Sequence, residues 1–150
     1  MQDKSLDEFY KKMDDLMPNL IRESVKRGAD EVTKGLITVP QMLILETLNK
    51  KEECIMSELA EALSITTSAA TGLIDRMIRL NLVTRSRCEK DRRIVNVNIT
   101  EKGKNTISGI IEERRRMIVD TFGKLSKEER EKYLEIMEKV YRILTQRESA

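Results

Sequence analysis

Residues 56–80, MSELAEALSITTSAATGLIDRMIRL, decide the fold class of this chain. Apolar residues recur with helical spacing on both sides of a short polar turn at residues 64–66, which predicts helices over 56–63 and over about 67–80. Two short helices joined by a tight turn are typical of the helix-turn-helix motif. The second helix has a wide apolar stripe for packing against a core, formed by Ala70, Leu73, Ile74, Met77 and Ile78.

The opposite face of the second helix has small and hydroxyl side chains near its start and arginines near its end. Small residues let a helix approach base edges in the major groove, while hydroxyl groups and a helix N-terminus can bind phosphate. The pattern indicates binding to double-stranded DNA, with candidate contacts at Thr66, Thr67, Ser68, Thr71, Gly72, Arg76 and Arg79. A helical hairpin that packs in this way without contacting DNA is the alternative.

A basic hairpin is predicted directly after these helices. Residues 95–99 alternate between apolar and polar types, which predicts a half-buried strand, and residues 82–87 are its expected partner. Cations cluster around the polar turn between them, at Arg85, Arg87, Lys90, Arg92 and Arg93. Residues 66–104 contain nine basic and four acidic side chains, a net charge of +5, whereas the whole chain carries +2. Such a hairpin beside a recognition helix is a wing that can place arginine in a narrow minor groove, and an ordinary solvated turn is the alternative.

Long amphipathic helices are expected at both ends of the chain. The first spans residues 6–26, where Pro18 should kink the helix or shift its boundary. Capping residues begin the later helices, at Thr38, Thr100 and Ser126. A lobe at residues 37–104 is too small to cover all the apolar residues of these helices. We therefore expect residues 1–36 and 105–150 to form the helical dimerisation region of a two-fold homodimer, with an intramolecular three-helix packing as the alternative.

The composition does not support catalysis or metal binding. The chain has no His and only two Cys, which removes the commonest general base and the usual zinc ligands. Its carboxylates follow helix-surface charge patterns. We therefore expect no enzyme, no metal and no cofactor. The charged N-terminus and the absence of an apolar run of roughly 18 residues indicate a cytoplasmic protein with Cys54 and Cys88 as reduced thiols.

Several motifs resemble the MarR-type regulators, and the resemblance covers nearly the whole chain. They are Thr38-Val39-Pro40-Gln41, Ser57-Glu58-Leu59-Ala60, Gly72-Leu73-Ile74-Asp75-Arg76-Met77 and the wing. The most specific is Asp91-Arg92-Arg93 followed, after five residues, by Ile99-Thr100-Glu101-Lys102-Gly103. It is similar to the family's wing signature, in which an Asp, any residue and an Arg precede a hydrophobic residue, Thr, two residues and Gly.

The resemblance implies a mostly α-helical fold with a small β-hairpin wing, in which two copies interlock through their terminal helices. It implies that Arg93 enters the minor groove and that Asp91 holds this arginine, or a nearby one, by an ion pair. Many members have an Arg where this chain has Gly72. A base contact by that Arg is therefore absent, and the operator does not follow by analogy.

The resemblance further implies a repressor that a small-molecule effector releases from DNA. The expected lining of the effector pocket is Met13, Met17, Met42 and Leu45, although these residues are also explained as core. A dimer should bind a near-palindromic operator with half-sites about 10 to 11 base pairs apart. A transcriptional activator and a winged-helix module that binds protein are the alternatives.

Overall fold

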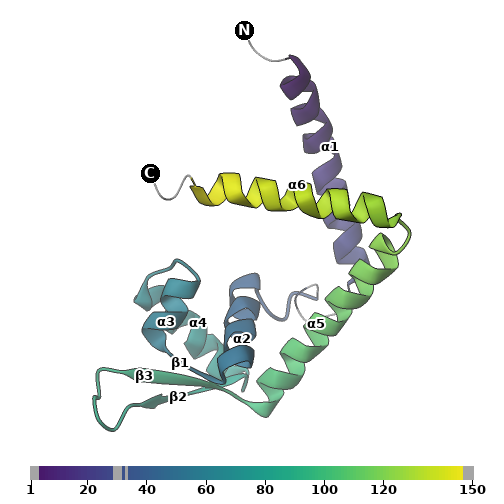
Figure 1. Cartoon of the computed structure of the whole chain (residues 1–150). Helices are drawn as coiled ribbons and strands as arrows, with labels where there is room; N and C mark the ends of the chain where they lie inside the picture. Colours follow the sequence, from purple (N-terminus) through teal and green to yellow (C-terminus); the bar gives the residue numbers. More distant parts are fainter. Residues whose placement is uncertain (1–3, 29–31, 33, 147–150) are drawn as a thin grey trace. The chain divides into compact units, whose positions relative to one another are not determined.

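The computed structural model describes residues 4–28, 32 and 34–146. In these residues it contains α1 (Lys4–Arg27), α2 (Val39–Lys51), β1 (Glu53–Ile55), α3 (Met56–Ala62), α4 (Thr67–Arg79), β2 (Val83–Arg87), β3 (Val95–Ile99), α5 (Glu101–Phe122) and α6 (Lys127–Gln146) (Figure 1). The predicted mostly α-helical fold with a small sheet is confirmed. The chain divides into two compact units, one ending at Glu113 and the other beginning at Arg114, so the division falls within α5.

The first unit contains a lobe with one hydrophobic core. Its fully buried side chains come from α2 to α5 and from all three strands, and include Ile44, Leu48, Leu59, Ile74, Met77, Val97 and Ile107. On α4 the buried residues are Ala70, Ile74 and Met77, while Leu73 and Ile78 are half-buried against the same core. The predicted stripe is therefore the core-facing side of α4, and the opposite side of the helix faces outward.

The sheet has the strand order β1-β3-β2, with both pairings antiparallel. In the predicted hairpin, Val83 pairs with Ile99 and Arg87 pairs with Val95. The sequence analysis did not predict β1. Three residues are too few to show an alternating pattern. The strand is defined instead by its partner, because Cys54 pairs with Val97.

Side-chain caps begin the helices at the predicted positions. The Thr38 hydroxyl accepts a hydrogen bond from the Gln41 amide at 3.4 Å, and the Thr38 amide donates to Gln41 Oε1 at 3.0 Å. Ser126 and Glu129 make the same reciprocal pair before α6, at 3.2 and 2.7 Å. Each pair satisfies amides of the first turn that have no partner within the helix.

The first helix is continuous through its proline. α1 runs from Lys4 to Arg27 with Pro18 inside it, so of the two expected effects the shift of the helix boundary does not occur, and a kink stays a prediction. A proline removes one main-chain hydrogen bond and crowds the preceding turn. In a helix of 24 residues the turns on both sides keep their own hydrogen bonds, and the helix continues.

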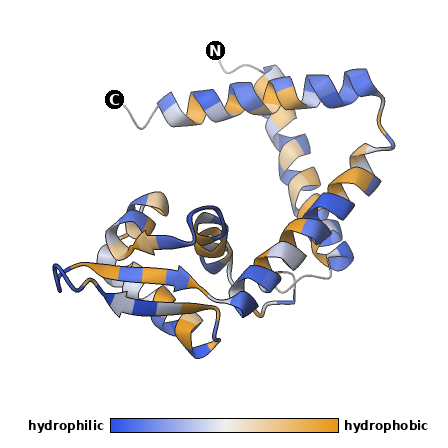
Figure 2. Cartoon of the chain, turned by 60° about the horizontal axis from the view of Figure 1, so that its bottom comes forward, coloured by the Kyte–Doolittle hydropathy of each residue, from blue (hydrophilic) through white to orange (hydrophobic). Residues whose placement is uncertain are grey.

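The two terminal helices bury no residue in the single chain. Figure 2 shows hydrophobic and hydrophilic residues alternating along both helices, the pattern of amphipathic helices. In the second unit, the rings of Phe122 and Tyr133 lie 5.2 Å apart between centroids. The Arg130 guanidinium donates to the Leu125 carbonyl at 2.5 Å. Within the described ranges, every helix is too short or too polar to cross a membrane.

Candidate nucleic-acid interface

Two threonine hydroxyls make hydrogen bonds that stabilise the start of α4. The Thr66 hydroxyl accepts from the Ala69 amide at 3.1 Å, and the Thr71 hydroxyl donates to the Thr67 carbonyl at 2.9 Å. These two hydroxyls therefore stabilise the helix, although each oxygen can still accept a further hydrogen bond. Thr67 and Ser68 are exposed in the first turn, where the positive end of the helix dipole favours an anion.

Gly72 lies on the exposed side of α4, and the fold gives no reason for a glycine there. A Cβ atom added at this position would meet no atom within 4 Å. Glycine in a helix interior is roughly 0.5–1 kcal/mol less favourable than alanine. A residue without a side chain, despite its lower helix propensity, suits a surface that a partner approaches closely. Arg76 and Arg79 are exposed farther along the same helix.

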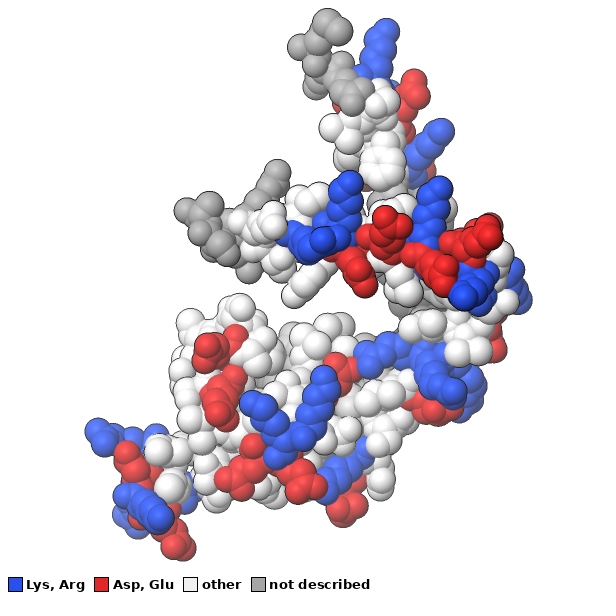
Figure 3. Space-filling view, viewed as in Figure 1, with Lys and Arg blue, Asp and Glu red and all other residues white. Residues whose placement is uncertain are grey.

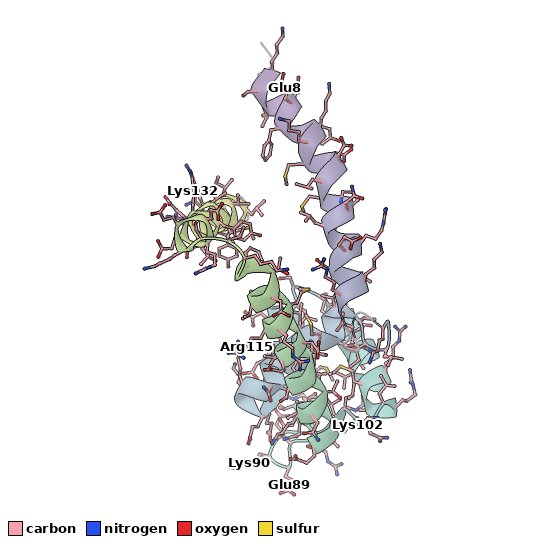
Figure 4. All side chains as sticks on the ribbon, turned by 90° about the vertical axis from the view of Figure 1, so that its right-hand side faces the viewer. Glu8, Glu89, Lys90, Lys102, Arg115 and Lys132 are labelled. Atoms are coloured by element: carbon pink, nitrogen blue, oxygen red, sulfur yellow. The ribbon has the colours of Figure 1, made fainter. Side chains whose placement is uncertain are left out.

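The wing consists of β2, β3 and the turn that joins them. The Cys88 amide donates to the Ile94 carbonyl at 2.9 Å, and the Ile94 amide donates to the Asp91 carbonyl at 3.0 Å, which closes the turn. All the cations predicted for the wing are exposed, namely Arg85, Arg87, Lys90, Arg92 and Arg93. Figure 3 shows charged side chains of both signs gathered at the wing tip, and Figure 4 places Glu89 and Lys90 there.

Asp91 orients Arg93 within the wing turn. Its carboxylate accepts from Arg93 Nε and Nη2 at 3.1 Å each, and from the Arg93 amide at 3.1 Å. These bonds hold the pKa of the Asp91 carboxyl below its ordinary value, because Arg93 stabilises the ionised form. The Arg93 side chain is nevertheless 91% exposed. The ion pair implied by the family resemblance is therefore present, and it involves Arg93 itself.

A second ion pair joins the wing to the recognition helix. Arg85 Nη1 on β2 lies 2.7 Å from Asp75 Oδ1 on α4. The sequence analysis predicted that Arg85 contacts DNA and did not predict its pairing with Asp75. The two residues are ten positions apart on different elements, and only the packing of the hairpin against α4 brings them together.

A groove of about 640 Å³ lies between α3, α4 and the wing. Five of the predicted DNA-contacting residues line it: Thr67, Thr71, Arg85, Arg87 and Arg93. Two serines and several apolar side chains, including Ile55 and Val95, complete the lining. The other predicted contacts on α4 and on the wing turn, such as Ser68 and Arg92, are exposed and do not line this groove.

The end of α4 is held by the first turn of α5. The Thr100 hydroxyl donates to the Asn81 carbonyl at 2.6 Å, and Lys102 Nζ donates to the Leu80 carbonyl at 2.9 Å. A Cβ atom on Gly103 would clash with the Leu82 carbonyl. The Thr and Gly of the wing signature thus have a structural role, since they let α5 approach the C-terminus of α4. Lys102, which the sequence did not single out, adds a cation where the helix dipole favours one.

The four residues predicted to line an effector pocket have different environments. Met13 and Met17 on α1 are exposed, while Met42 on α2 is half-buried against the core. Leu45 has no exposed surface and is a core residue. The structure therefore offers a ligand at most three of these side chains, and the pocket stays a prediction.

The two cysteines lie in different environments. Burial raises the pKa of the Cys54 thiol, and the nearby Glu58 raises it further, so Cys54 is a protonated core residue. Cys88 is a free thiol in the wing turn. Among the described residues, no group of three or more His, Cys, Asp or Glu side chains could hold a metal ion.

Taken together, a lobe with the order α2-β1-α3-α4-β2-β3 and a cationic hairpin defines a winged helix-turn-helix protein. Residues 37–95 match the model of the MarR family. The uncharacterized HTH-type transcriptional regulator YsmB of Bacillus subtilis is 30% identical over 104 residues, which are 69% of this chain and 71% of that protein. The uncharacterized HTH-type transcriptional regulator YfiV of the same organism is 35% identical over 95 residues, which are 63% of this chain but only 59% of that protein.

A solved structure is similar over nearly the whole chain. The structure of a MarR family protein from Bacillus stearothermophilus is 28% identical, with a TM-score of 0.71 and coverage of 97% of this chain and 99% of that one. This chain belongs to the MarR family of DNA-binding transcriptional regulators. It is a regulator and not an enzyme.

Proposed function

We propose that this chain binds a specific operator as a homodimer, with α4 of each copy in a major groove and Arg93 of each wing in the adjacent minor groove. The observation that carries the proposal is the continuity of the surface: one groove is lined both by the start of α4 and by the arginines of the wing. Such a surface matches three features of duplex DNA: base edges, phosphates and a neighbouring minor groove.

The terminal helices support the homodimer. They expose large apolar side chains, including Leu6, Phe9, Leu16, Leu20 and Ile21 on α1 and Leu134, Met137, Val140, Tyr141 and Leu144 on α6. An exposed apolar stripe along a helix marks an interaction site. A second copy that covers it through a two-fold axis is the commonest arrangement. We assign residues 1–36 and 105–150 to this dimerisation region, and residues 37–104 to the DNA-binding lobe.

Selection of bound duplexes from a random pool tests the proposal. Two lobes related by a two-fold axis should enrich a near-palindrome whose half-sites are about 10 to 11 base pairs apart. Affinity for the selected duplex should fall steeply as salt rises, because phosphate contacts release counterions. An unenriched pool, together with salt-insensitive capture of a protein, would instead favour the winged-helix protein-interaction module.

We propose that the dimer acts as a repressor in the cytoplasm. Two bound lobes cover neighbouring grooves and exclude other proteins from the same duplex, which favours repression where the operator overlaps a promoter. The two cysteines are free thiols, as expected in a reducing compartment. Reporter transcription from a promoter that contains the selected operator should fall when the chain is expressed, and a rise would identify an activator.

We further propose that a small apolar effector releases the dimer from DNA. The exposed Met13 and Met17 and the half-buried Met42 offer flexible apolar surface for such a ligand. Release requires the effector to bind the DNA-incompetent state more tightly than the competent one. A candidate compound that binds the protein yet leaves operator affinity unchanged at saturation is not the effector.

A further inference from the structure

The ion pair between Asp75 and Arg85 differs from the other ion pair of the wing. It joins two elements, α4 and β2, with Nη1 and Oδ1 2.7 Å apart, and the two side chains are 41% and 40% exposed. The pair formed by Asp91 and Arg93 lies within one turn and leaves Arg93 91% exposed. One pair therefore orients an exposed arginine, whereas the other fastens a strand to a helix.

From this difference we infer that Arg85 is a positioning residue for DNA recognition rather than a phosphate contact. Its guanidinium is neutralised by Asp75 and fixes the position of the wing relative to the recognition helix. The inference rests on the proposed DNA binding, and it removes Arg85 from the set of direct contacts that the sequence suggested.

The positioning role follows from what a specific complex requires. A selected duplex presents its major-groove bases and the adjacent minor groove at one fixed spacing. The wing must therefore be held at the matching distance from α4, so that α4 reaches the major groove while the wing reaches the minor groove. Binding to an unrelated duplex depends on phosphate charge and has no such requirement. An ion pair that is about 40% exposed also contributes little to folding stability, so its loss should change wing position and leave the fold intact.

The full-length chain with single, double and reversed substitutions tests this inference, with affinities measured for the selected duplex and for an unrelated one over a salt series. Asp75→Ala and Arg85→Ala should each weaken binding to the selected duplex by about tenfold, and the double variant should be no weaker than either single variant. The reversed pair, Asp75→Arg with Arg85→Asp, should recover most of the affinity.

The unrelated duplex and the salt dependence separate positioning from contact. Asp75→Ala should bind the unrelated duplex as tightly as the unmodified chain or more tightly. Arg85→Ala should keep the salt slope of the unmodified chain, whereas Arg87→Ala should lower the slope by about 0.9, the value for one lost phosphate contact on B-form DNA.

Glu52→Gln is the matched control. It breaks an exposed ion pair to Lys104 of 3.4 Å, away from the residues proposed to contact DNA, and changes the net charge by the same amount as Asp75→Ala. It should bind both duplexes like the unmodified chain. Thermal melting should show every variant folded. If one is not, Asp75→Asn replaces Asp75→Ala and Arg85→Gln replaces Arg85→Ala.

The inference is overturned if Arg85→Ala weakens both duplexes equally and lowers the salt slope, while Asp75→Ala strengthens both. Arg85 would then be a phosphate contact that Asp75 partly neutralises. A failure of the proposed function has a different result, because the unmodified chain itself would then bind no duplex in a salt-dependent way.

Discussion

Arg93 combines two properties that a minor-groove reader needs. Asp91 accepts hydrogen bonds from its Nε and Nη2, which fixes the direction of the guanidinium, and the side chain remains 91% exposed. Nη1 has no part in the pair, so it can donate to a base edge or a sugar oxygen. Orientation before binding reduces the side-chain entropy lost when the contact forms.

Replacing Arg93 by Ala should weaken binding to the selected duplex by about 1–3 kcal/mol, the range for losing a specific arginine contact, and should relax base preference where the wing lies. Fluorescence anisotropy on the selected duplex and on versions changed only at the flanks measures both effects. Arg92→Ala, on the same turn, should produce a smaller loss that is uniform across these duplexes. Unchanged affinity for Arg93→Ala would remove Arg93 from the interface.

The same ion pair makes an acid-dependent prediction. The pKa of Asp91 is lowered in the folded chain, so the pair contributes its stabilisation at and above the ordinary range for a carboxyl. That contribution is lost only as the pH falls through the lowered pKa. Titration of the Asp91 carboxyl by NMR should give a pKa below its ordinary value, and Arg93→Ala should return it toward that value. An Asp91 pKa that does not respond to Arg93→Ala would contradict the pairing.

At the scale of elements, local patterns predicted most of the lobe. The apolar stripe on α4 and the caps at Thr38 and Ser126 depend on residues within a few positions of one another, and the structure confirms them. β1 was missed because its partner strand lies about forty residues farther along, at the Cys54–Val97 pairing. The Asp75–Arg85 ion pair was missed for the same reason, because only packing of α4 against β2 brings the two side chains together.

Gly72 allows a prediction about the recognition helix as an element. Gly72→Ala and Gly109→Ala each add a methyl group in open space within a helix, so both should stabilise the chain, by roughly 0.5–1 kcal/mol. Only Gly72→Ala should weaken operator binding, by about tenfold, because its methyl group separates α4 from the base edges. Thermal melting and anisotropy measure the two effects. If both variants bind the operator like the unmodified chain, α4 does not approach the bases through this face.

At the scale of the whole molecule, the proposed function depends on a second copy of the chain. α1 and α6 bury no residue in the single chain and expose apolar side chains along their length. Sequence reasoning predicted these stripes, but one chain alone does not define the surface that covers them. A substitution on the apolar face of α6 tests the proposed dimerisation region.

Leu144→Glu places a charge on the apolar face of α6, where a dimer would have to bury it. The unmodified chain should sediment with twice its mass of 17.4 kDa, and the variant should shift toward that single mass. Lys139→Gln changes the net charge by the same amount at an exposed polar position of the same helix, and it should remain dimeric. Equal sedimentation of all three proteins as dimers would place the interface elsewhere.

Hydroxyl-radical footprinting of the unmodified chain on its selected duplex tests the central claim most directly. Paired recognition helices and wings should protect two symmetric regions, with half-site centres about 10 to 11 base pairs apart and the flanking minor grooves protected as well. A single protected region without symmetry, or no protection at low ionic strength, would contradict the account.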